Sequence, residues 1–586
     1  MYDILNRING VDDVKKLSLD ELTVLASDIR EALFHRLTKI GGHFGSNFGM
    51  VEAEIALHYV FSSPKDKIIF DVSHQSYPHK MLTGRRLGYT DERHFCEDSG
   101  YSNPEESEHD LFNIGHTSTS ISLATGLAKA RDLNGEKYNV IALIGDGSLS
   151  GGLALEGLSV AGSELSSNLI IVVNDNQQSI SETHGGIYKN LRLLRETKGA
   201  APLNMFKAWG LDYIYEENGN DLAALIKLFQ KVKDVDRPIV VHLNTVKGKG
   251  YERAEKNKEA WHWTLPFDRE TGLSSAPPRG GYYPGIIKNY LVEKAKKDKK
   301  VVLVTPNMPG SIGLSVEERQ SLGERYIDVG IAEEQAVTMA SGLAKGGLKP
   351  LVFTNMTFLQ RAYDQISHDV CINGTHVTFL LAYSSFVGLT DVTHLGIFGL
   401  PIFLNIPNLV VLAPTCSNEL TEMTEWALDK STQPTMILIP GGEVCPRNVH
   451  FNGDLGYRIA RKGEKLAIVA AGDFFHRGEI LADEVQKRFG FAPTLVDPKN
   501  LAALDEKTLR DLEQDHQVII SLEDGVLDGG FGEKIAAFYG NSAIKFKAYG
   551  LKKRFYDRYD PEKLLVSLGA DVQSILNDLA VLFEKI

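Results

Sequence analysis

Apolar runs alternate with amphipathic stretches along most of the chain. In the first 267 residues, short runs rich in β-branched residues, such as NVIALIGDG (139–147) and NLIIVVNDN (168–176), end in Gly, Asp or Asn. This pattern is typical of buried parallel strands whose carboxyl ends carry polar residues. Because ligands of open α/β sheets bind at those ends, we expect a binding site there.

The same alternation recurs in two further regions. A stretch rich in Gly, Pro and Ser at 268–285 closes the first region, and another set of apolar runs begins after about 448. The pattern predicts three doubly wound α/β domains in series. Their predicted bounds are 1–267, a linker 268–285, then 286–447 and 448–586. The last stretch, VQSILNDLAVLFEKI, is predicted to be a packing helix.

The composition and charge of the chain argue against several classes of binding partner. A formal net charge of -13, with no basic run that carries interleaved aromatic residues, argues against nucleic-acid binding. No stretch approaches the ~20 apolar residues of a membrane span, and the N-terminus lacks the apolar core of a signal peptide. The four cysteines are scattered and suit a reducing compartment. We therefore expect a cytoplasmic protein with small-molecule partners, no nucleic acid and no membrane.

Two polar motifs follow neighbouring apolar runs. Asp146 lies between glycines in GDG, and Asn176 ends NDN thirty residues later. Taken alone, Asp146 fits a helix cap equally well. The spacing, however, matches one helix plus one strand, which brings both residues to the same edge of a parallel sheet. One carboxylate and an amide oxygen suit Mg²⁺ that also binds phosphate, so the pair predicts a magnesium site.

The GDG and NDN pair resembles the diphosphate–magnesium signature of thiamine-diphosphate enzymes. FDVSHQSYPHKMLTGR (70–85), NIGHTSTSISLATGLA (113–128) and TFLQRAYDQISHDV (357–370) extend the likeness. From about residue 30 to the C-terminus the chain resembles the 1-deoxy-D-xylulose-5-phosphate synthase family, a group of transketolase-like enzymes. HQSYPHK and TFLQRAYDQ separate it from ordinary transketolases.

The resemblance implies a function and partners. Members of the family decarboxylate pyruvate and join the two-carbon unit to an aldehyde such as glyceraldehyde 3-phosphate. They use thiamine diphosphate and Mg²⁺ and associate as homodimers. The three predicted domains then become a diphosphate-binding domain, a pyrimidine-binding domain and a C-terminal transketolase-like domain.

The resemblance also assigns candidate residues. The implied Mg²⁺ ligands are Asp146, the Asn176 side chain and the Gln178 carbonyl. The implied cofactor contacts are His74, Gly115, His116, Thr117, Gly147, Ser148, Asn176, Tyr251, Glu333 and Phe358. Glu333 matches the glutamate that bonds the aminopyrimidine, and we expect burial to raise its pKa. His43, His262 and His394 are candidates for moving substrate protons, with His79 ranked below them, and Arg361 is the candidate substrate contact.

The chain departs from the family pattern around the acceptor. Tyr383, Leu438 and Gly441 stand where the family has arginines, and Asn355 stands where it has tyrosine. NGND (218–221) replaces a DGHD motif. Because arginine forks match phosphate oxygens, these changes predict an altered, unphosphorylated or different acceptor.

Three other functions compete with this interpretation. One is transketolase-like transfer of a two-carbon unit between sugar phosphates. Another is a non-catalytic scaffold that binds the cofactor, which the retained Glu333 argues against. A phosphate-loop protein is disfavoured because the chain has no GxxxxGK[ST] motif.

Overall fold

The computed structural model describes residues 2–276, 282–445 and 447–584. The chain divides into two compact units, which are described separately. Unit 1 comprises Met1–Pro278 and Gly330–Ala332, and unit 2 comprises Arg279–Val329 and Glu333–Ile586. Residues 277–281 of the predicted linker lie outside the described part.

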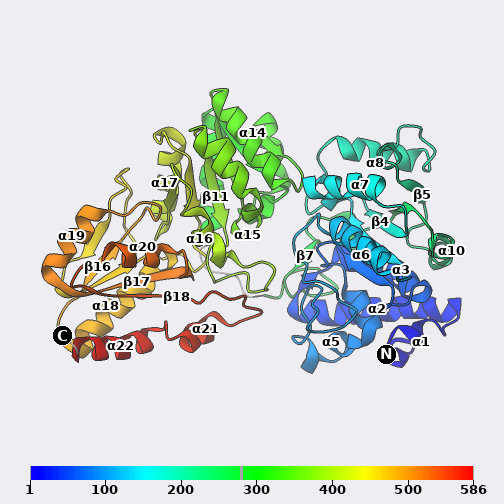
Figure 1. Ribbon diagram of the computed structural model, residues 1–586, viewed down its shortest axis with the longest axis horizontal. Coiled ribbons are helices and arrows are strands. Elements are labelled where there is room, and N and C mark those ends of the chain that lie inside the picture. The colour runs from blue at the N-terminus through cyan, green and yellow to red at the C-terminus, as the bar shows by residue number, and fades with distance from the viewer. Residues whose placement is uncertain (1, 277–281, 446, 585–586) are drawn as a thin grey trace. The chain divides into compact units, whose positions relative to one another are not determined.

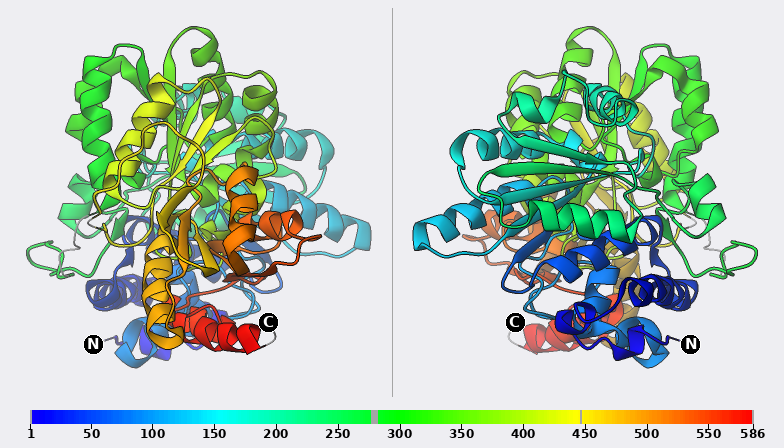
Figure 2. Two further views of the ribbon diagram at one scale, coloured as in Figure 1. Left: turned by 90° about the vertical axis from the view of Figure 1, so that its left-hand side faces the viewer. Right: turned by 90° about the vertical axis from the view of Figure 1, so that its right-hand side faces the viewer.

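Unit 1 is built on a five-stranded parallel sheet (Figure 1). Its strand order is β2 (Lys67–Phe70), β3 (Val140–Gly145), β4 (Leu169–Asp175), β6 (Pro238–Asn244) and β5 (Asp212–Glu216). Helices lie on both sides of the strands in the right-hand view of Figure 2. Connections that each cross over through a helix keep the strands parallel and gather their carboxyl ends at one edge.

Side-chain alternation explains the two layers of helices in unit 1. Ile141 and Leu143 of β3 pack with α3 (Gly45–Val60) and α10 (Leu222–Val232). Their neighbours Ala142 and Ile144 pack on the other face, with α6 (Ser120–Asn134) and α7 (Gly152–Glu164). A strand covered on both faces is apolar throughout, as the sequence pattern indicates.

Unit 2 begins with a six-stranded parallel sheet. Its order is β12 (Val410–Leu412), β13 (Thr435–Leu438), β11 (Thr378–Ala382), β10 (Lys349–Asn355), β8 (Val301–Thr305) and β9 (Tyr326–Asp328). Ala336 and Val337 of α14 (Glu333–Lys345) pack on one face. The other face is covered by α12 (Tyr283–Lys297) and α17 (Ser417–Asp429).

A second sheet of unit 2 has five strands. The order is β14 (Arg458–Arg461), β16 (Thr494–Asp497), β15 (Lys465–Ala470), β17 (His516–Val526) and β18 (Lys545–Leu551), with only β14 antiparallel among these described strands. Its helices include α18 (Phe475–Phe489) and α20 (Phe531–Phe538). Three sheets, each covered by helices, confirm the predicted α/β class, while the exact domain boundaries stay predictions.

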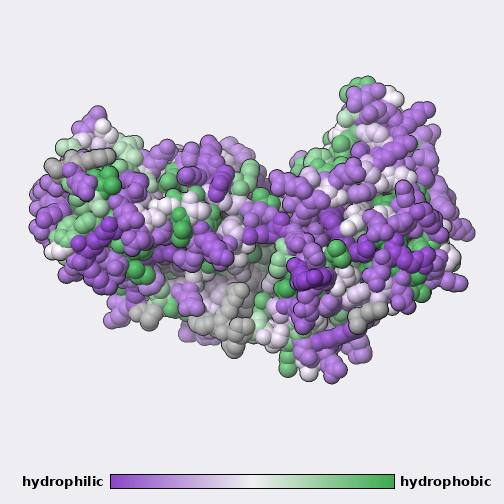
Figure 3. All heavy atoms as spheres, turned by 90° about the horizontal axis from the view of Figure 1, so that it is seen from below, coloured by the Kyte–Doolittle hydropathy of each residue, from purple (hydrophilic) through white to green (hydrophobic). Residues whose placement is uncertain are grey.

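Contrary to the expectation from the sequence, one C-terminal segment of the described chain, Pro561–Glu584, is long and apolar enough by length and composition to cross a membrane. It consists of α21 (Pro561–Leu568) and α22 (Val572–Glu584), separated at Gly569, whose φ is 68°. Leu565, Ile575 and Leu579 are buried in the core of the second sheet of unit 2. This confirms the predicted packing helix. The face of the molecule in Figure 3 is mainly hydrophilic, with apolar side chains scattered over it.

Candidate active site

The GDG and NDN motifs lie at one edge of the unit 1 sheet, as their spacing predicts. Gly145 pairs with Asn174 across β3 and β4, and the Asp146 N–H donates to the Asn174 carbonyl at 3.0 Å. Asp146 caps a short 3-10 helix, because its Oδ1 accepts the Gly147 N–H at 3.0 Å. The capping interpretation therefore accounts for only one carboxylate oxygen.

Two buried oxygens at this edge fit a bound cation. Asp146 Oδ2 and Asn176 Oδ1 are buried and have no hydrogen-bond partner in the described part of the chain. Buried polar atoms normally have a partner, and an unpaired one destabilises the fold by ~1–3 kcal/mol. One carboxylate and one amide oxygen are ligands that Mg²⁺ accepts when phosphate and water complete its coordination. Gln178 follows in the same loop, where its side chain contacts the Ile180 carbonyl.

The electrostatics of this edge also favour a cation. Burial, and then the neighbouring Asp175, raise the pKa of Asp146 well above its ordinary value. Burial acts on Asp175 too, but hydrogen bonds from His242, at 2.9 Å, and from Arg195 lower its pKa overall. Asp175 thus stays ionised beside Asp146, and a divalent cation would relieve the repulsion.

Three of the predicted histidine and cofactor residues form a cluster. The ring centroids of His43, His74 and His262 lie 5.0 to 5.6 Å from one another. A two-residue ribbon creates the cluster, because β1 (Gly42–His43) pairs with β7 (Trp263–Thr264). Burial, and then Lys247, lower the pKa of His74 to about 3 and that of His262 well below its ordinary value. Both rings are therefore neutral near pH 7.

Lys247 is a site residue that the sequence analysis missed. Its buried ammonium donates to the Ser179 carbonyl at 2.6 Å and lies 3.1 Å from His262 Nδ1. Burial lowers its pKa to about 7, against the attraction of Asp146. The signal in the sequence is a lysine among glycines, VKGKG, directly after β6.

The remaining cofactor candidates of unit 1 lie in two neighbouring loops and one separate position. Gly115, His116 and Thr117 precede α6, and Ser118 Oγ donates to the Ser148 carbonyl at 2.8 Å. A Cβ at Gly147 would come within 2.6 Å of Ser179 Oγ, so a larger residue there would have to displace Ser179. Tyr251 instead packs its ring against Phe34 and Phe44, and its hydroxyl donates to the Arg269 carbonyl.

In unit 2, four other predicted site residues form two contacting pairs. Glu333 is the first residue of α14 and is buried, and Arg361 donates to its Oε2 at 3.3 Å. Burial raises the pKa of Glu333 while Arg361 opposes that rise, which confirms the expected direction. Phe358, in α15 (Met356–Leu359), lies edge-on to His394 with ring centroids 5.5 Å apart.

The departures from the family pattern have different environments. Asn355 and Ala382 are paired at the carboxyl ends of β10 and β11, and Tyr383 follows with φ 51°. Asn355 Oδ1 is buried and has no partner among the described residues. Leu438, by contrast, is part of the apolar core. Introducing an arginine should therefore affect the stability of the protein differently at position 383 and at position 438.

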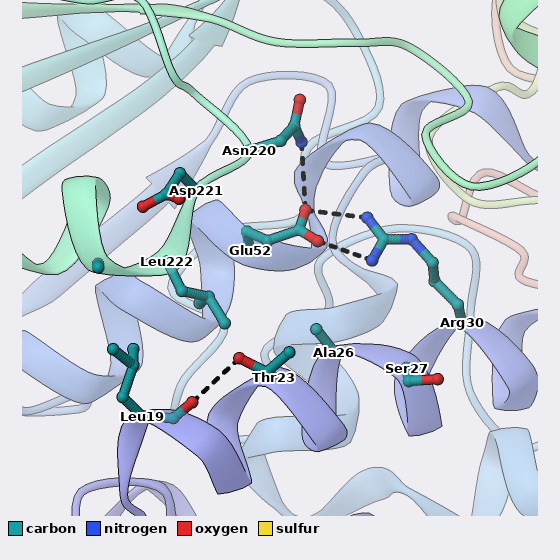
Figure 4. A pocket seen from close by; sticks show the side chains of 10 residues that line it. Leu19, Thr23, Ala26, Ser27, Arg30, Glu52, Asn220, Asp221 and Leu222 are labelled. Carbon is teal, nitrogen blue, oxygen red and sulfur yellow. Dashed lines mark hydrogen bonds and ion pairs between the residues drawn. The ribbon is translucent and has the colours of Figure 1, made fainter.

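Asn220 and Asp221 of the NGND segment, which departs from the family pattern, line a cavity of about 380 Å³ (Figure 4). Glu52 accepts two hydrogen bonds from Arg30, at 2.7 and 2.9 Å, and one from Asn220 at 3.2 Å. Asn220 also donates to the Gly49 carbonyl. These groups satisfy one another and hold α3 to the 218–221 loop. No predicted site residue lines this cavity within the described part of the chain.

Comparisons with known proteins agree with the motifs. A family model described as 1-deoxy-D-xylulose-5-phosphate synthase matches residues 5–203 and 192–245. The transketolase pyrimidine binding domain matches 283–446, and the transketolase C-terminal domain matches 456–575.

Curated relatives extend the match over nearly the whole chain. A 1-deoxy-D-xylulose-5-phosphate synthase of Syntrophomonas wolfei is 38% identical over 99% of this chain and 97% of its own. The corresponding protein of Clostridium acetobutylicum is 37% identical over 95% and 96%. That of Clostridium botulinum is 35% identical over 99% of both. The chain belongs to the 1-deoxy-D-xylulose-5-phosphate synthase family.

Proposed function

We propose that this chain decarboxylates pyruvate and joins the resulting two-carbon unit to an aldehyde, with glyceraldehyde 3-phosphate as the first candidate acceptor. Its family is one of thiamine-diphosphate-dependent transferases. The observation that carries the proposal is the pair of buried, unpartnered oxygens of Asp146 and Asn176 at the carboxyl edge of the unit 1 sheet. They supply the cation ligands that a diphosphate cofactor needs.

The diphosphate end of the cofactor would be held by unit 1. Asp146, Asn176 and the Gln178 carbonyl would bind Mg²⁺, while backbone N–H groups at Gly147 and Ser148 would approach the phosphates. The Lys247 ammonium, attracted by Asp146, adds positive charge beside them. His74 and the 115–117 loop would complete the contacts.

The remaining residues would handle protons. When bound, thiamine diphosphate supplies a nucleophilic carbon and an electron sink for decarboxylation. The buried Glu333 carboxylate, with its raised pKa, would accept a proton at the aminopyrimidine, and Phe358 would pack against that ring. His43, His262 and His394 would accept or return substrate protons, and the lowered pKa of His262 keeps its ring neutral in the resting protein.

The acceptor site would rely on fewer cations than the family pattern provides. Arg361 remains, and it is shared with Glu333. Tyr383 and Leu438 replace two arginines, and each lost charge-assisted contact weakens phosphate binding by ~1.5–3 kcal/mol. An acceptor without a phosphate is therefore the alternative to glyceraldehyde 3-phosphate.

We further propose a cytoplasmic homodimer, since closed two-fold assemblies are the commonest among soluble enzymes. Leu153 and Val160 on α7 are exposed apolar side chains that an interface would cover. Light scattering on the purified protein tests the assembly.

The function is tested by CO₂ release from pyruvate with thiamine diphosphate and Mg²⁺, measured against a panel of phosphorylated and unphosphorylated aldehydes. Acceptor-dependent CO₂ release supports the proposal, and the preferred aldehyde identifies the acceptor. Transfer from a ketose without CO₂ would favour the transketolase alternative. Cofactor binding without either reaction would favour a scaffold. Asp146→Ala, which removes the cation ligand, is the matched inactive control.

A further inference from the structure

Asp71 links the loops that carry the predicted cofactor residues of unit 1. It follows β2 directly and is buried, and its N–H donates to the Leu143 carbonyl of β3 at 2.7 Å. Its carboxylate accepts two backbone N–H groups, from Ser118 at 2.8 Å and from Ser120 at 2.9 Å. Both donors belong to the segment that follows Gly115, His116 and Thr117.

The linkage continues to the GDG turn. Ser118 has a left-handed φ of 74°, and its Oγ donates to the Ser148 carbonyl at 2.8 Å. Residues other than glycine rarely adopt this backbone conformation, so contacts with neighbouring segments must hold Ser118 in it. The two hydrogen bonds of Asp71 and the Ser148 contact are those contacts.

The same residue also fixes the loop that carries His74. The Asp71 carbonyl accepts the Ser73 N–H at 2.5 Å and the Gln75 side chain at 3.1 Å. Val72 and Ser73 both have left-handed φ, 58° and 64°. Ser73 Oγ in turn donates to the Ile114 carbonyl at 2.6 Å, next to Gly115.

We propose that Asp71 is a positioning residue for the diphosphate site: it sets the geometry of the His74 loop, the 115–118 loop and the GDG turn relative to one another. This rests on the proposed function, since it assumes that these loops bind the cofactor. A carboxylate suits the task because it accepts two N–H groups at once and bonds them more strongly than a neutral amide does.

Asp66 provides a matched control at the opposite end of the same strand. It is also buried, and it accepts the Ser62 N–H at 2.7 Å and the Asn139 N–H at 2.8 Å. It therefore has the same chemistry as Asp71 but lies at the amino end of β2, away from the carboxyl edge. The two variants Asp71→Asn and Asp66→Asn both lose a buried carboxylate that accepts backbone N–H groups.

The test is calorimetric titration of each purified full-length protein with thiamine diphosphate and Mg²⁺, together with thermal unfolding and steady-state turnover. We expect Asp71→Asn to raise the cofactor Kd about tenfold to a hundredfold, because a charge-assisted contact that orders the loops is weakened. At saturating cofactor its kcat should stay within about threefold of the wild type, since Asp71 touches no reacting atom. Asp66→Asn should lower Tm while its cofactor Kd stays within about twofold.

The experiment distinguishes a failure of the proposed function from a failure of the positioning role of Asp71. No cofactor binding by the wild type would contradict the proposed function. Normal wild-type binding with an unchanged Kd in Asp71→Asn, or an equal rise in both variants, would overturn the positioning role. If Asp71→Asn does not fold, Ser118→Ala takes its place, because it breaks the contact from Ser118 Oγ to the Ser148 carbonyl through which the loop held by Asp71 reaches the GDG turn. It should raise the cofactor Kd, and an unchanged value would overturn the inference.

Discussion

The Arg361 guanidinium donates to the Glu333 carboxylate over 3.3 Å at the start of α14. Burial raises the pKa of Glu333, and the positive charge of Arg361 limits that rise. The retained arginine of the predicted acceptor site is thus also the electrostatic partner of the predicted proton acceptor. Changes at Arg361 should therefore affect both acceptor binding and the pH dependence of turnover.

Replacing Arg361 by leucine should shift the pH profile. Without the cation the pKa of Glu333 rises further, so the acidic limb of the kcat profile should move to higher pH by about one unit. The KM for a phosphorylated aldehyde should rise about tenfold or more, because a charge-assisted contact is lost. Arg361→Lys is the control: it keeps the charge but not the planar fork, so only KM should rise. An unchanged acidic limb in Arg361→Leu would contradict the coupling.

The adjacent glutamates Glu333 and Glu334 allow a matched test of the proton acceptor. Glu333 is 2% exposed, whereas Glu334 is only half-buried. Glu333→Gln should lower kcat by at least about a hundredfold, the lower range for loss of a general acid–base group, while cofactor binding changes little. Glu334→Gln should keep near-normal turnover. CO₂ release and calorimetry measure the two effects, and the reverse ranking would make Glu334 the proton acceptor.

Regular strand geometry explains which parts of the site were predictable from sequence. The approach of Asp146 to the NDN segment follows from one crossover between parallel strands, which fixes neighbouring carboxyl ends at one edge. Glu333, by contrast, follows only from the family resemblance, and the structure places it at the buried start of α14. The strand pattern therefore locates the GDG and NDN motifs but not Glu333.

Contacts between segments distant in sequence were not predictable in this way. His43 meets His262 through a two-residue ribbon that is too short for any periodic pattern. Lys247 looks like a surface residue among glycines, yet α3 packs so closely that a side chain at Gly49 would come within 2.9 Å of the Val246 carbonyl. His79 shows the converse: its buried hydrogen bonds to His58 and Asp110, both 2.9 Å, give it a structural environment.

Lys247→Met should stabilise the cofactor-free protein and weaken cofactor binding. The pKa of Lys247 is about 7 in the folded protein and 10.5 ordinarily, so the unfolded chain binds the proton more tightly between these values. The buried ammonium therefore destabilises the fold fully below pH 7, and this effect declines as pH rises toward 10.5.

The Tm of Lys247→Met should exceed that of the wild type most at about pH 6 and least at about pH 9. The expected gain in the free energy of unfolding at low pH is about 1–3 kcal/mol, typical when a buried charge is replaced by an apolar side chain. The cofactor Kd should rise about tenfold. Thermal unfolding across pH and calorimetry check both effects. A lower Tm at every pH would show that the Ser179 and His262 contacts outweigh burial.

Restoring an arginine should succeed at position 383 and fail at 438. Leu438 is 7% exposed in the apolar core and lines a small pocket with Asp473 and Asp524. Leu438→Arg must fit a longer side chain into this tightly packed site, so it should lower the free energy of unfolding by about 1–3 kcal/mol even with a carboxylate beside it. Tyr383 is only half-buried, and its hydroxyl lies 3.5 Å from that of Tyr282. Its left-handed φ of 51° is already occupied by a residue with a side chain, so arginine adds no backbone strain there.

Tyr383→Arg should therefore fold and lower the KM for a phosphorylated aldehyde about tenfold, since a guanidinium fork matches phosphate oxygens. The KM for the same aldehyde without its phosphate is the internal control and should stay within about twofold, because the added contact needs the phosphate charge. Steady-state kinetics with the two aldehydes measure the difference. An equal fall in both KM values would show that the arginine acts on the pocket's shape, and no change in either would place residue 383 outside the acceptor site.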